Sequence, residues 1–136
     1  MTFRSEEEID HLLSAFDSGA LPRYCWTHAV HVAMCAAVLW KAGTLDEIRT
    51  GIERYNASQG TAASFYHETL TRFWIETVRG HLDESRPESR PESRLDAVRR
   101  VIGKFGLDSA LPRKRYTFDV FNSDEARARW IAPDQA

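Results

Sequence analysis

Apolar positions recur along this chain at spacings of three and four residues, the period of an amphipathic helix. The pattern predicts five helices and a short sixth one. They begin at Ser5, Thr27, Thr44, about Ser64, Ser93 and near Ser123. Residues that cap helix starts open most of these segments, and glycines such as Gly19 and Gly43 close them. The fourth helix, from about Ser64 to Asp83, is the longest and most aromatic.

Two segments depart from the helical period. Residues 116–121, YTFDVF, alternate between apolar and polar side chains and are the one strand-like piece. Residues 86–93 repeat Arg-Pro-Glu-Ser, in which proline cannot continue a helix and few side chains have anything to bury. We therefore predict an exposed linker at about 85–93.

The expected fold is all-α, a single-domain antiparallel helical bundle of about five helices plus a short C-terminal helix, spanning residues 1–136. A chain of 136 residues is long enough to bury about two thirds of its unfolded surface. The helices predicted at about 27–41 and 64–83 are the most apolar. We expect them to face each other at the centre of the bundle.

Composition narrows the class of protein. Apolar residues make up 43% and charged residues 28%, the balance of an ordinary globular domain. The longest apolar run, Val32 to Trp40, is too short to cross a bilayer, and the acidic opening MTFRSEEEID lacks the pattern of a signal peptide. A net charge of −2 provides no field that attracts nucleic acid or an anionic membrane. We expect a cytoplasmic protein that binds neither.

Histidines stand out within the two most apolar segments. His28 and His31 are one helical turn apart and share a face, and His67 falls inside the apolar arc of the helix expected to lie opposite. Three imidazoles converging from two helices can bind a divalent metal ion and leave a coordination position for water or substrate. Nitrogen ligands favour zinc or iron over magnesium or calcium.

Candidate catalytic residues lie next to His67. Glu68 falls at the margin of the apolar sector, where its carboxylate could be a fourth ligand, a partner orienting an imidazole, or a general base, and Tyr66 would stand beside a small polar organic substrate. Hydrolysis, isomerisation and oxidation are equally compatible with such a site. Polar groups nearby are Thr27, Tyr55, Asn56 and Thr71.

A non-catalytic protein is the alternative. Core histidines are commonly hydrogen-bonded structural residues, and the spacing H-x-x-H is frequent by chance. In this interpretation the histidines form a buried polar network that fixes how the helices pack, and aromatic surfaces bind a partner helix or a second copy. Cys35, one turn beyond His31, is expected to be a packing residue. His11 and His81 are too distant to join the cluster and are expected at the surface.

Three stretches of the sequence resemble a family of small, largely uncharacterised bacterial proteins. They are LPRYCWTHAVHVA, IERYNASQGTAASFYHETLTRFW and SDEARARWIAPD, within about residues 21–134. The family has the motifs W-T-H-x-x-H, Y-N, Y-H-E-T-[LI]-T and A-R-x-x-W-[VI]-x-P-D. The motif positions in this chain are Trp26, Thr27, His28, His31, Tyr55, Asn56, Tyr66, His67, Glu68, Thr69 and Thr71.

The chain departs from this pattern at two positions. Many members have an acidic residue directly after the first histidine and a glycine before Tyr-His-Glu, where this chain has Ala29 and Phe65. The first departure removes one possible acidic ligand. The resemblance implies that the histidine cluster is a site, and it leaves the reaction unnamed.

Overall fold

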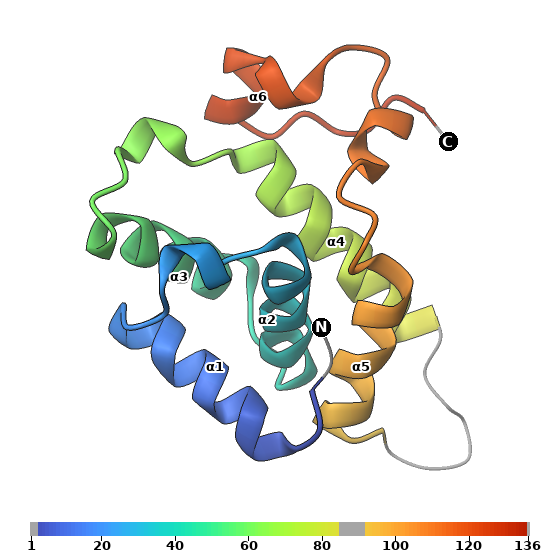
Figure 1. Cartoon of the computed structure of the whole chain (residues 1–136). Coiled ribbons are helices and arrows are strands. Elements are labelled where there is room, and N and C mark those ends of the chain that lie inside the picture. Colours follow the sequence, from blue (N-terminus) through green and yellow to red (C-terminus); the bar gives the residue numbers. More distant parts are fainter. Residues whose placement is uncertain (1–2, 85–91, 136) are drawn as a thin grey trace.

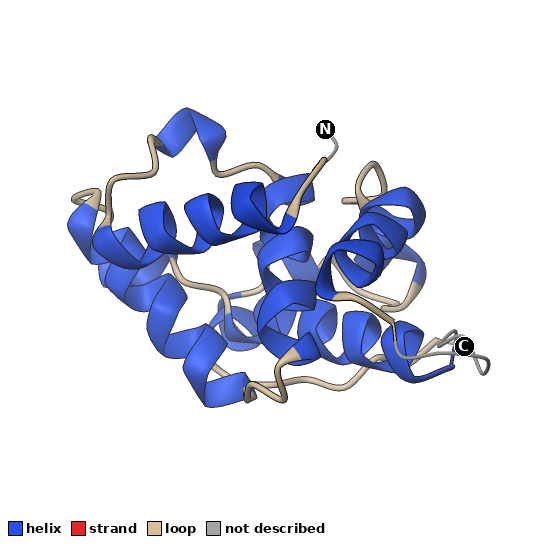
Figure 2. Ribbon diagram, turned by 90° about the horizontal axis from the view of Figure 1, so that it is seen from below, coloured by secondary structure: helices blue, strands red, loops and turns tan. Residues whose placement is uncertain are grey.

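All of the regular structure is helical in the computed structural model, which describes residues 3–84 and 92–135. The α-helices are α1 (Glu6–Ser18), α2 (His28–Trp40), α3 (Leu45–Ser58), α4 (Glu68–Glu84), α5 (Arg94–Phe105) and α6 (Asp124–Ala128). Four 3-10 turns accompany them: η1 (Arg23–Cys25), η2 (Ala63–Phe65), η3 (Leu111–Lys114) and η4 (Val120–Asn122). Figure 2 shows no strand in the described ranges. The prediction of an all-α bundle with five longer helices and a short sixth one is confirmed.

Side-chain caps explain where five of these helices begin. In each, a hydroxyl oxygen at the residue before the helix accepts a hydrogen bond from the backbone N–H three residues later. The cap residues are Ser5, Thr27, Thr44, Ser93 and Ser123. Each such cap stabilises its helix by about 1 kcal/mol. These starts were predicted from the sequence and are confirmed.

Helix α2 forms the centre of the molecule. In Figure 1 it lies between α1 and α3 on one side and α4 and α5 on the other. Its buried residues include Val30, Val32, Ala33, Met34, Cys35, Ala36 and Ala37. A helix buried around most of its circumference is expected to be apolar on more than one face. The predicted contact between the two most apolar helices is also present, since the His28 ring on α2 lies 4.5 Å from the Trp74 ring on α4.

The same local structure precedes α2 and α4. A 3-10 turn is followed by an aromatic residue, then by a residue that caps the helix. Before α2 the pair is Trp26 and Thr27, and before α4 it is Tyr66 and His67. His67 therefore precedes α4 and does not lie within it.

Two predictions about local structure are wrong. Helix α4 begins at Glu68, four residues later than predicted, because residues 63–65 form the turn η2. The YTFDVF stretch is no strand, because Tyr116 and Val120 are buried while residues 117–119 are exposed, so burial does not alternate. The greater part of the predicted linker, residues 85–91, lies outside the described residues. Within the described ranges, no helix combines the length and apolar character needed to span a bilayer.

Candidate functional site

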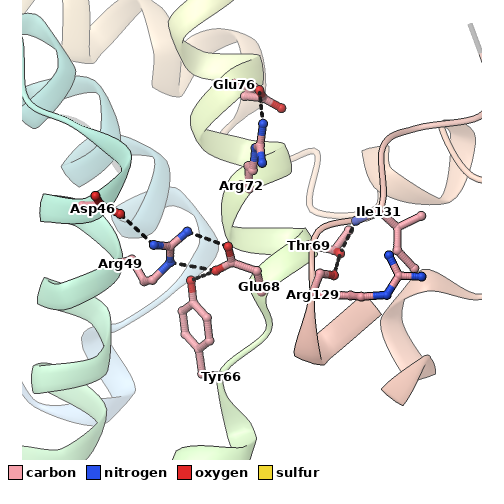
Figure 3. A network of polar contacts seen from close by, with 9 residues as sticks. All are labelled: Asp46, Arg49, Tyr66, Glu68, Thr69, Arg72, Glu76, Arg129 and Ile131. Carbon is pink, nitrogen blue, oxygen red and sulfur yellow. Dashed lines mark hydrogen bonds and ion pairs between the residues drawn. The ribbon is translucent and has the colours of Figure 1, made fainter. Parts of the chain in front are cut away.

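Three consecutive residues at the start of α4 bind three different parts of the chain. His67 bonds to η4, Glu68 to α3, and Thr69 to the segment after α6. Figure 3 shows the Glu68 and Thr69 contacts, with α3 on one side of α4 and the C-terminal segment on the other. These residues belong to the Y-H-E-T motif on which the candidate site was predicted.

The Glu68 carboxylate is held by three hydrogen bonds. Arg49 on α3 donates from Nε to Oε1 at 2.9 Å and from Nη2 to Oε2 at 2.6 Å, and the Tyr66 hydroxyl donates to Oε1 at 2.7 Å (Figure 3). Arg49 also donates to the Asp46 carboxylate at 2.7 Å. The Glu68 and Arg49 side chains are only 16% and 30% exposed, so solvent screens the pair weakly.

The pKa values follow from these bonds. Burial raises the pKa of Glu68, but the hydrogen bonds from Arg49 and Tyr66 outweigh burial and leave that pKa lowered. Burial and the bond to Glu68 raise the pKa of Tyr66 well above its ordinary value. Near neutral pH Glu68 is therefore a carboxylate and Tyr66 a neutral phenol. This state suits an ion pair better than a general base, which works best with a pKa near the working pH.

Both ring nitrogens of His67 are used in structural bonds. Its Nδ1 accepts from the backbone N–H of Leu70 at 3.1 Å, which makes this imidazole the N-cap of α4. Its Nε2 lies 2.9 Å from the Val120 carbonyl oxygen and donates to it, since a carbonyl can only accept. His67 is thus a neutral imidazole protonated on Nε2, and burial lowers its pKa.

Thr69 attaches the C-terminal segment to α4. Its hydroxyl donates to the Arg129 carbonyl at 2.6 Å and accepts from the Ile131 N–H at 3.0 Å. Thr69 is completely buried. On the next turn, the Arg72 guanidinium lies over the Trp130 ring at 4.5 Å. Residues 129–131 are therefore held against α4 by polar and aromatic contacts.

His28 connects α2 to the end of α5. It occupies the first position of α2, and its Nε2 donates to the Phe105 carbonyl at 2.9 Å. Phe105 is the last residue of α5, where carbonyl groups lack partners within the helix. Burial lowers the pKa of His28. The bond adds to the one that this carbonyl accepts from the Asp108 N–H, and it orients the His28 ring against Trp74.

His31 has a different environment. Its ring lies 5.1 Å from the Trp26 ring, and its Nε2 is a buried atom that has no hydrogen-bond partner in the described residues. Burial and the nearby His28 lower the pKa of His31 to about 4. The imidazole is neutral near pH 7 and acts there as an aromatic packing group.

The three predicted metal ligands do not come together. Within residues 3–84 and 92–135, no group of three or more His, Cys, Asp or Glu side chains has the geometry to hold a metal ion. The physical reason is the position of His67. It precedes Trp74, the α4 residue that His28 contacts, by seven residues, or about 10 Å along a helix. A site for zinc or iron stays a prediction that these contacts do not support.

Other predicted residues have structural contacts as well. The Tyr55 hydroxyl donates to the Leu21 carbonyl at 2.9 Å, and the buried Asn56 accepts from Arg23 at 3.1 Å. Cys35 is fully buried, and burial raises the pKa of its thiol to about 12, which agrees with the predicted packing role. His11 is exposed as predicted, whereas His81 is half-buried with its ring 5.3 Å from that of Phe105.

The sequence reasoning missed the arginines. Arg23 and Arg49 join the motif residues to neighbouring elements, but no sequence pattern distinguishes either one from an ordinary surface arginine. Comparisons of the chain with models of protein families, with curated proteins and with solved structures found no match. The resemblance to the small bacterial family is accordingly a prediction that these comparisons leave untested.

Proposed function

We propose that this protein is a non-catalytic helical binding module whose motif histidines, glutamate and threonine fix how its elements pack. The observation that carries the proposal is the set of bonds at the start of α4. One nitrogen of His67, both oxygens of Glu68 and the hydroxyl of Thr69 bond to other parts of the chain, and the second nitrogen of His67 caps α4. The same motif can therefore recur in sequences because it holds the fold together.

Chemistry at these groups would disrupt the packing. A general base must present a free lone pair to its substrate, yet Glu68 faces the fixed charge of Arg49 with both oxygens bonded. Loss of Glu68 as a partner would leave the partly buried Arg49 with only the exposed Asp46 carboxylate and would cost about 1–3 kcal/mol. These interior side chains are therefore suited to a structural role. We assign binding to the surface of the protein.

The surface contains side chains typical of binding sites. Tyr24 is 85% exposed and Phe65 is 60% exposed, and they lie on η1 and η2, the two turns that precede α2 and α4. Exposed aromatic residues on ordered turns are frequent anchors in protein interfaces. This supports a module that contacts another molecule through these turns.

A metal-dependent enzyme is the second candidate. One observation favours it: the buried Nε2 of His31 has no partner in the described residues, as a ligand nitrogen would in the absence of its metal. To complete a three-histidine zinc or iron site, His67 would have to give up one of its two bonds, to Leu70 or to Val120, and its ring would have to move toward His28 and His31. That exchange needs a rearrangement at the start of α4.

Elemental analysis distinguishes the two candidates. The protein is produced without a His-tag in medium supplemented with zinc, iron and manganese, and its metal content is compared with that of His31→Leu and the exposed control His11→Leu. The binding-module proposal expects substoichiometric metal in all three proteins and no change in unfolding midpoint with a chelator. Stoichiometric metal that disappears only in His31→Leu would establish the metal centre instead.

A further inference from the structure

The turns η1 and η2 present one surface built from aromatic and cationic side chains. We call it the turn surface and define it by Arg23, Tyr24, Phe65 and Arg127. The Arg23 guanidinium lies 5.5 Å from the centre of the Phe65 ring, and Arg127 donates to the Phe65 carbonyl at 2.8 Å. Phe65 therefore contacts Arg23 through its ring and Arg127 through its backbone carbonyl, and Tyr24 directly follows Arg23 in η1.

Hydrogen bonds hold this surface in place. Arg23 donates to the Asn56 side chain at 3.1 Å and to the Thr61 hydroxyl at 3.2 Å, so η1 is joined to the end of α3 and to the loop before η2. Gln59 adds a bond to the Gly19 carbonyl at 3.0 Å across the same two connections. Aromatic anchors on ordered backbone lose little conformational entropy when a partner binds.

Neither arginine has a carboxylate partner among the described residues. In the part of the chain that the structure describes, Arg23 and Arg127 bond only to neutral oxygens, those of carbonyl, amide and hydroxyl groups. Several other arginines have carboxylate partners instead. They are Arg49, Arg54, Arg72, Arg94, Arg100 and Arg129. The turn surface is thus locally cationic on a chain whose net charge is −2.

We propose that the turn surface binds an acidic peptide segment of a partner protein, one that carries an aromatic or large apolar side chain. The surface is complementary to such a segment, because the Arg23 guanidinium lies against the exposed Phe65 ring, Arg127 lies at the Phe65 backbone, and the largely exposed Tyr24 adjoins Arg23 in sequence. Carboxylates of the partner bond to the arginines, and its apolar side chain covers the rings. This inference rests on the binding role proposed above and names the chemistry of its partner.

Selection from a library of short random peptides tests the proposal, with the full-length chain as the target. We expect enriched peptides to contain Asp or Glu around Trp, Phe or Leu. Tyr24→Ser and Phe65→Ser should each weaken their binding about tenfold, the loss typical of an interface anchor. Arg127→Gln should weaken binding and reduce its salt dependence between about 0.05 M and 0.5 M NaCl, because one screened charge contact is lost.

Leu107→Ser is the matched control. Leu107 is a fully exposed apolar residue after α5, outside the turn surface, so its loss should leave peptide affinity unchanged. Tyr24 is largely exposed, so Tyr24→Ser should retain the wild-type unfolding midpoint and report on binding alone. Enriched peptides without acidic residues, affinities equal in wild type and Tyr24→Ser, or no enrichment at all would overturn the proposal.

Two further outcomes distinguish a failure of the acidic-peptide proposal from a failure of the proposed non-catalytic function. Self-association of the chain that Tyr24→Ser abolishes would overturn the peptide partner and replace it with a second copy. Bound metal in the same preparation would contradict the non-catalytic role instead, whereas peptides insensitive to the turn surface contradict only the acidic partner.

Discussion

Arg49 and Glu68 form a two-bond ion pair that joins α3 to the start of α4, with N···O distances of 2.9 and 2.6 Å. The geometry is that of a planar guanidinium facing a carboxylate, which gives direction as well as strength. The pair lies 19 residues apart in sequence, so it fixes a tertiary contact. Its energetic role can be measured.

Removing either partner of this pair should destabilise the protein. We expect Glu68→Gln and Arg49→Met each to lower the free energy of unfolding by about 1–3 kcal/mol, because Glu68 loses its one cationic partner in the described residues and Arg49 keeps only its bond to the exposed Asp46. The double variant should lose less stability than the two single variants together. The difference, measured by urea unfolding, is a coupling energy of about 1–3 kcal/mol.

The pair Arg54 and Asp17 serves as the control for that cycle. Its N···O distance is 3.1 Å, but the side chains are 52% and 66% exposed, so water and salt screen it. We expect a coupling energy below about 1 kcal/mol. Equal coupling in the two cycles would contradict a structural role for the Glu68 pair.

His67 should stabilise α4 through both nitrogens. His67→Asn retains a side chain that can cap the helix but loses the bond to Val120, so we expect a loss of about 1 kcal/mol. His67→Leu removes both bonds, and we expect a loss of about 2–3 kcal/mol. The same two replacements at the exposed His11 should leave the midpoint of thermal unfolding nearly unchanged. A His67→Leu variant as stable as wild type would contradict this assignment.

Thr69→Val should release the C-terminal segment. Valine has nearly the shape of threonine but cannot bond to the Arg129 carbonyl or the Ile131 N–H, so we expect a loss of about 1–3 kcal/mol. Hydrogen exchange should rise at residues 129–131 more than at the centre of α2. The same replacement at the exposed Thr50 controls for the change in residue type. Exchange that rises equally everywhere would indicate a global effect and count against a local attachment.

His31 predicts how stability depends on pH. Its folded pKa, about 4, lies below the ordinary value of 6.5, so the unfolded chain binds the proton more readily. The resulting contribution to stability is complete above pH 6.5 and is lost as pH falls toward 4, by about 3 kcal/mol in total. His31→Leu should flatten this part of the curve. It should also be neutral or stabilising at pH 7, because a buried nitrogen without a partner is removed. If the stability of His31→Leu falls between pH 6.5 and 4 as much as that of the wild type, the pKa assigned to this ring is contradicted.

Local rules made most helix starts predictable. Ser5, Thr27, Thr44 and Ser93 were recognised as caps because a hydroxyl before an apolar period satisfies backbone N–H groups within the same few residues. The start of α4 was mispredicted because its cap is a histidine and the preceding turn carries Phe65 and Tyr66. Those aromatic residues extend the apolar period beyond the real helix.

The partners of the candidate site could not be predicted. His28 and His67 bond to carbonyl groups of Phe105 and Val120, and backbone atoms look alike in every sequence. Arg49 falls on the polar side of the helical period, where the sequence does not distinguish it from a solvent-exposed arginine. Periodicity thus located the motif residues on two contacting elements. It could not fix how far one element is shifted along the other. Whether the three imidazoles converge depends on that shift.

Imidazole tautomers test the central claim most directly. In a long-range ¹H–¹⁵N spectrum of the uniformly labelled protein at neutral pH, His28 and His67 should each appear as the neutral form protonated on Nε2, because both donate to carbonyl oxygens. Adding one equivalent of Zn²⁺ should leave these resonances unchanged. Zinc-induced shifts of ring nitrogens in His28, His31 and His67 together would show a metal centre and contradict the structural role proposed for these residues.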